Sequence, residues 1–148
     1  SWPNRKQRQP ELVGTSHMAR SVLIVRWYLG LWMLFWGLNW FFRFVPQPMG
    51  LNSNYLHLAF MQSGLFSCAK SLEVLMGASL LLNRGVPLML VVVFPVTVMV
   101  AFIDLWVESL WRIEIWGLLV LLSHVYLLAA FNSYYRPMLQ WRAQPKLD

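Results

Sequence analysis

The stretch "FSCAKSLEVLMGASLLLNR", residues 66–84, decides the fold because it is apolar over a length that matches a membrane. Lys70 and Glu73 are its only charged residues before Arg84. Three positions apart, they share one face of a helix and can neutralise each other. An ion inside a bilayer costs about 2.5–3.5 kcal/mol on insertion scales. We therefore expect both side chains to face another helix rather than lipid.

The composition of the whole chain also indicates a membrane protein. Of its 148 residues, 58% are hydrophobic and only 12% are charged, against about 25% charged in an average soluble domain. The chain has too little polar surface to cover a water-facing globule, which predicts an integral membrane protein. The net charge of +6 lies mostly at the chain ends and in one short loop. That distribution favours the lipid bilayer as a partner and argues against nucleic acid.

The chain contains four apolar segments, at residues 22–44, 56–82, 86–107 and 113–135. About 20 helical residues cross a bilayer core of about 30 Å. The backbone must satisfy its own hydrogen bonds in lipid, so the segments are expected to be helices. The sequence thus predicts an all-α, integral membrane four-helix bundle over residues 21–140. Residues 1–20 are expected to be a polar, basic tail, and residues 141–148 a second tail.

The distribution of Lys and Arg predicts the orientation of this bundle. One side carries nine basic residues and the other carries two, Arg43 and Arg112. The nine are Arg5, Lys6, Arg8, Arg20, Arg26, Arg84, Arg136, Arg142 and Lys146. Both termini are therefore expected on the cytoplasmic side of a bacterial cytoplasmic membrane.

Each predicted helix has one face that is smaller or more polar than the rest. Glycine lets two helices approach closely in a membrane. The glycines on these faces are Gly30, Gly37, Gly77 and Gly117. Pro95 lies inside the third segment, where it is expected to kink the helix and free a carbonyl group.

Five ionisable residues are candidates for a site within the membrane: Arg26, Lys70, Glu73, Asp104 and His124. The Lys70–Glu73 pair has three interpretations: a structural ion pair, part of a ligand, quinone or proton site, or a contact to a partner subunit. His124 is more typical of a hydrogen-bonded core residue than of a haem or pigment ligand. No metal site and no catalytic motif of a soluble enzyme is expected.

An ordered set of residues between 60 and 98 resembles the DoxX-like family of small four-helix membrane proteins. The matching residues are Ser63, Gly64, Lys70, Glu73, Gly77, Asn83, Arg84, Pro87, Leu88 and Pro95. "GLNWFFRFVPQP" (37–48) and "YYRPML" (134–139) resemble the family as well. Many relatives carry Asn and His in the third helix where this chain has Met99 and Asp104.

The resemblance implies a four-span helical fold and a role beside other membrane proteins. The first expectation is a non-catalytic accessory or assembly subunit of a larger, redox-linked membrane complex, with other membrane subunits as partners. One alternative is a quinone-reactive oxidoreductase subunit of the thiosulfate:quinone type. Another is a protein that binds a lipid-like small molecule inside the bundle.

Overall fold

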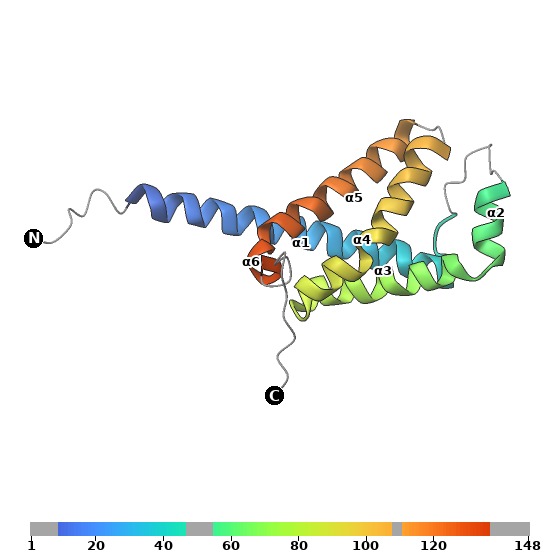
Figure 1. Ribbon diagram of the computed structural model, residues 1–148, viewed down its shortest axis with the longest axis horizontal. Helices are drawn as coiled ribbons and strands as arrows, with labels where there is room; N and C mark the ends of the chain where they lie inside the picture. The colour runs from blue at the N-terminus through green and yellow to red at the C-terminus, as the bar shows by residue number, and fades with distance from the viewer. Residues whose placement is uncertain (1–8, 47–54, 108–110, 137–148) are drawn as a thin grey trace, which may run out of the picture.

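The computed structural model describes residues 9–46, 55–107 and 111–136, and every regular element in these ranges is a helix (Figure 1). The main helices are α1 (Gln9–Phe42), α3 (Leu65–Leu82), α4 (Val86–Phe102) and α5 (Trp111–Ala130). The shorter elements are α2 (Tyr55–Gln62), the π-helical turn η2 (Ile103–Val107) and α6 (Asn132–Tyr135).

Three helical segments among the described residues are long and apolar enough to cross a membrane. They are His17–Phe42, Leu65–Leu82 and Val86–Trp106. The apolar part of α5, Ile115–Ala130, is shorter. The expectation of a helical protein with membrane-spanning segments is therefore confirmed at this level.

The segment expected to form one span at 56–82 is two helices. The break falls at Ser63 and Gly64, where Gly64 has a φ of 77°. This left-handed conformation suits glycine because it lacks a Cβ. The Ser63 hydroxyl donates a hydrogen bond of 3.0 Å to the Phe60 carbonyl, which closes the end of α2. The span is therefore α3 alone, and α2 is a separate short helix.

Helix α1 differs from the expected span 22–44 at both ends. It begins at Gln9, so part of the segment expected to be a polar tail is helical. Figure 1 shows this part of α1 extending past the other helices. The helix ends at Phe42 because the buried amide of Asn39 pairs with Val45. Its Nδ2 donates to the Val45 carbonyl at 3.0 Å, and its Oδ1 accepts from the Val45 N–H at 2.8 Å.

The two remaining expected spans are helical, but neither is continuous. The segment 86–107 is α4 followed by the π turn η2. The segment 113–135 is interrupted at Phe131, between α5 and α6. The tail expected at 141–148 lies outside the described residues.

The main helices pack in sequence: α1 against α3, α3 against α4, α4 against α5, and α5 back against α1. The core lies between them and consists of Leu29, Met33, Met76, Leu80, Val86, Leu90, Val93, Val120 and Leu127. Figure 1 shows α4 bending along its length. Pro95 lies inside α4 and has no N–H to donate, which accounts for a bend there.

Candidate functional site

The Lys70–Glu73 pair forms within α3 on its packed face. The Lys70 ammonium donates to Glu73 Oε1 at 3.0 Å and to Oε2 at 2.8 Å. Lys70 is 8% exposed and Glu73 3% exposed, so both charges are removed from the surface. The Lys70 Nζ also lies 5.3 Å from the centre of the Phe66 ring. Each charge therefore has its counter-charge one helical turn away.

Glycines bring the backbone of α1 close to that of α3 beside this pair. A Cβ at Gly37 would lie 2.7 Å from Val74 Cγ2 and 3.1 Å from the Lys70 carbonyl oxygen. A Cβ at Gly77 would lie 2.6 Å from the Leu34 backbone nitrogen. Neither position has room for a side chain. Gly37 and Gly77 thus lie on the two sides of one close contact between α1 and α3.

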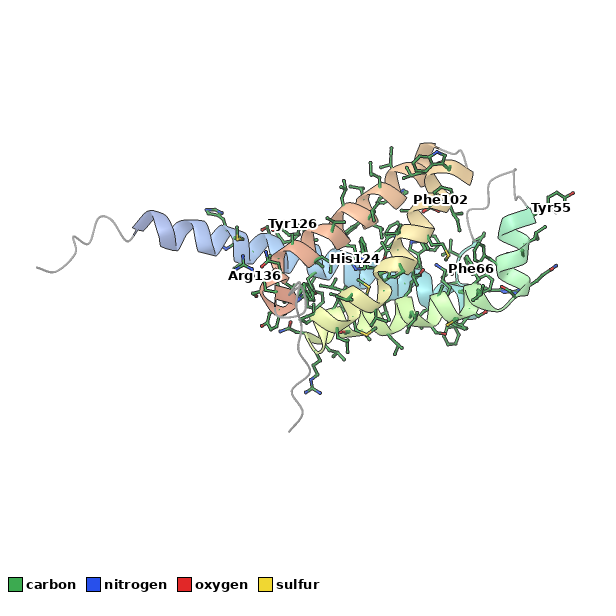
Figure 2. All side chains as sticks on the ribbon, viewed as in Figure 1. Tyr55, Phe66, Phe102, His124, Tyr126 and Arg136 are labelled. Carbon is green, nitrogen blue, oxygen red and sulfur yellow. The ribbon has the colours of Figure 1, made fainter. Side chains whose placement is uncertain are left out.

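His124 is fully buried and joins α5 to α4 (Figure 2). Its Nε2 lies 2.8 Å from the Leu90 carbonyl oxygen, and its Nδ1 lies 2.8 Å from the Thr97 hydroxyl. A carbonyl can only accept, so Nε2 donates to Leu90, and Nδ1 shares the second hydrogen bond with the Thr97 hydroxyl. The Phe94 and His124 rings meet in a T-shaped arrangement, with their centroids 5.4 Å apart. Both ring nitrogens are thus occupied by protein groups.

Asp104 lies in η2, one of the least common types of helical turn. Its carboxylate packs against Gly117 of α5, where an added Cβ would come within 2.9 Å of Oδ2. Gly117 precedes His124 by seven residues, about 10 Å along α5. Asp104 and His124 therefore occupy different levels of the α4–α5 contact.

Arg26 contacts the hairpin between α3 and α4. Its Nη1 donates to Oδ1 of Asn83, which caps α3 in the left-handed conformation with a φ of 54°. Asn83 lies ten residues beyond Glu73, about 15 Å along α3. Arg26 and the Lys70–Glu73 pair are therefore separate, and the five ionisable candidates do not form one cluster.

An open aromatic groove of about 310 Å³ runs along α1. It is lined by Tyr28, Leu31, Trp32, Phe35 and Trp36. The Trp32 ring stacks on Trp116 of α5, with centroids 4.9 Å apart. The groove is almost wholly apolar, and none of the five ionisable candidates lines it.

Two features of the polar interior were not expected from the sequence. Asn39 is fully buried and holds the chain that follows α1, and η2 interrupts the helical pattern around Asp104. Within the residues described, no group of three His, Cys, Asp or Glu side chains is arranged to hold a metal ion. Comparisons with protein-family models, curated proteins and solved structures found no match.

Proposed function

We propose that the chain is a DoxX-like integral membrane protein that acts by binding other membrane subunits, without catalysis of its own. In this proposal α1, α3, α4 and α5 form a four-helix bundle with both termini on the cytoplasmic side. The apolar part of α5, Ile115–Ala130, is about 24 Å of helix, and the whole helix of 20 residues reaches the bilayer thickness of about 30 Å only with its charged first turn. The excess of basic residues at the chain ends and at Arg84 supports this orientation.

One observation carries the non-catalytic role: the ionisable groups inside the bundle bind protein groups of the same chain. The Lys70 ammonium binds both oxygens of Glu73, and His124 uses both ring nitrogens. A catalytic acid, base or quinone ligand needs a group that can reach the substrate. These groups instead stabilise the helix packing.

The surface supports binding to partners in the membrane. Large apolar side chains are exposed along α1, among them Trp27, Leu31 and Phe35. Aromatic side chains supply much of the binding energy at protein interfaces. We assign this face of α1 to a partner subunit of a larger, redox-linked membrane complex.

A second function has one observation in its favour, the aromatic groove along α1. A groove of about 310 Å³ walled by Trp32, Phe35 and Trp36 is large enough for part of a lipid-like molecule such as a quinone. In that case the ligand would bind beside the bundle rather than at the Lys70–Glu73 pair.

Purification of the tagged chain from its own membranes in mild detergent tests the proposal. We expect a complex of defined mass that is not a multiple of 17.3 kDa. Phe35→Ala should release the partner. Phe102→Ala is the matched control: Phe102 is similarly exposed, but it lies on α4 outside the assigned face, so this variant should keep the partner. A stable monomer or a homo-oligomer would contradict the proposal. A monomer that keeps a quinone or lipid unless Phe35 is replaced would favour the second function.

A further inference from the structure

Three segments that are distant in the sequence bring arginines to one end of the helices. Arg26 of α1 binds Asn83, and Arg84 follows directly. The Tyr135 hydroxyl donates to the Pro87 carbonyl at 3.0 Å, which ties α6 and the adjoining Arg136 to the same hairpin. Figure 2 shows Arg136 at the α6 end of the molecule.

These arginines have no carboxylate to neutralise them within the described part of the chain. Glu73 is bound to Lys70, about 15 Å along α3 from Asn83. Asp104 lies beyond the far end of α4 from the hairpin. Neither of these two acids therefore supplies a counter-charge to Arg26, Arg84 or Arg136.

Arg26 is the least exposed of the three arginines. It is partly buried, whereas Arg84 and Arg136 are exposed. Its Nε is buried and has no hydrogen-bond partner in the structure, and Nη1 binds only a neutral amide oxygen. A partly buried cation without a counter-charge is costly. Within the described part of the chain, Arg26 therefore makes no charge-assisted hydrogen bond to a carboxylate.

The depth of the cluster indicates where a counter-anion would come from. Asn83 directly follows the candidate span Leu65–Leu82, and Val86 begins the next one. Arg84 thus lies where a span ends, which is the level of lipid headgroups. Arg26 belongs to the candidate span His17–Phe42 and reaches this level through its hydrogen bond to Asn83. Guanidinium groups bind phosphate oxygens in a bidentate manner, and basic pockets between helices at the cytoplasmic face bind anionic headgroups.

We infer that Arg26, Asn83, Arg84 and Arg136 form a binding site for the phosphate of an anionic phospholipid. Arg26 contacts the phosphate from the bundle side, and Arg84 and Arg136 contact it from the aqueous side. The excess of positive charge selects a lipid with a net negative charge over a zwitterionic one. The inference rests on the proposed arrangement of the helices in the membrane.

The full chain is reconstituted in vesicles of equimolar phosphatidylglycerol and phosphatidylcholine. Native mass spectrometry of the protein released from these vesicles then measures how much of each lipid stays bound, which tests the site. We expect retained phosphatidylglycerol to exceed phosphatidylcholine severalfold. Arg26→Gln should lower this preference about fivefold, the usual contribution of one arginine near a charged lipid surface. Arg84→Gln, at an exposed position, provides a second variant if Arg26→Gln does not fold. Circular dichroism establishes folding in each case.

Arg43→Asn is the matched control. It removes one positive charge from an exposed residue after α1, and asparagine tolerates the φ of 53° found there. Lipid preference should be unchanged. An equal loss in this control, or no headgroup preference in the parent chain, would overturn the inference. So would full displacement of the lipid by millimolar inorganic phosphate, which would indicate a soluble anion.

The same samples separate this inference from the proposed function. A chain that resists alkaline extraction from liposomes but shows no headgroup preference refutes only the lipid site. A chain that is extracted refutes the membrane-spanning arrangement itself.

Discussion

The α1–α3 contact and the α4–α5 contact solve the same packing problem in different ways. In the first, glycines bring two backbones together, and the charges are neutralised inside one helix. In the second, a fully buried His124 reaches from α5 to a carbonyl and a hydroxyl of α4. Polar groups are thus satisfied locally in one contact and between helices in the other.

Because of this difference, the two contacts should respond differently to substitutions. The α1–α3 contact depends on glycines, which have no side chain. Substitutions that add atoms there should therefore lower its stability most. The α4–α5 contact depends on hydrogen bonds across a bend, where Thr97 has a second acceptor in the Val93 carbonyl at 3.3 Å. We expect the first contact to tolerate less change than the second.

The largest effect is expected from breaking the Lys70–Glu73 pair. Glu73→Gln leaves the buried Lys70 ammonium without its counter-charge, and losing one partner of a buried ion pair costs about 3–5 kcal/mol. The free energy of unfolding, measured by denaturant titration in detergent micelles, should fall by that amount.

The double variant Lys70→Met/Glu73→Leu is the control for this prediction. It removes both charges and keeps apolar volume, so it should be more stable than Glu73→Gln. A ligand or proton site would behave differently, because Glu73→Gln would then abolish activity while leaving stability and assembly unchanged. That outcome would contradict the structural role of the pair.

An intermediate effect is expected from Gly77→Ala. The added Cβ would lie 2.6 Å from the Leu34 nitrogen and 2.8 Å from the Gly30 carbonyl oxygen, and neither backbone atom can move aside cheaply. Overpacking of this kind costs about 1–3 kcal/mol. The same unfolding titration measures it.

Gly30→Ala provides a matched comparison on the facing helix. Its added Cβ would meet side-chain atoms of Leu80 and Leu81 at 3.1 Å. Leucine side chains can shift, so the loss of stability should be smaller than for Gly77→Ala. Equal losses at the two glycines would show that backbone contact is not what distinguishes this interface.

The two contacts also differ in how far the sequence predicts them. The i,i+3 spacing of Lys70 and Glu73 determines their pairing, and helical periodicity places Gly77 on the same face. These relations lie within one helix, so they can be read from the sequence. The partners of His124 lie 27 and 34 residues away, on a helix whose bend sets their positions. No local pattern could identify them.

The ends of the helices were the least predictable part of the fold. Residues 56–82 are apolar enough to form one span, yet the chain breaks at Gly64 with a left-handed backbone. Asn39 lies in an apolar segment. Its two hydrogen bonds with the Val45 backbone form only once the chain turns after α1, so the sequence alone does not predict them. The η2 turn around Asp104 carries no signal in its composition.

The smallest effect is expected from His124→Leu, which tests the α4–α5 contact directly. The variant removes two hydrogen bonds between helices and nearly preserves the volume of the side chain. Such bonds inside membranes contribute about 0.6 kcal/mol on average and about 1.7 kcal/mol at most. Thr97 can turn its hydroxyl to the Val93 carbonyl, which limits the cost. We therefore expect a loss of about 1 kcal/mol, below that of Gly77→Ala.

Thr97→Val sharpens this last prediction because it removes only one of the two bonds made by His124. Its loss should not exceed that of His124→Leu, and the double variant should lose little more than His124→Leu alone, since both changes act on one network. A loss at His124 as large as that of Glu73→Gln would reverse the comparison. It would show that the α4–α5 contact depends on this histidine as strongly as α3 depends on its ion pair.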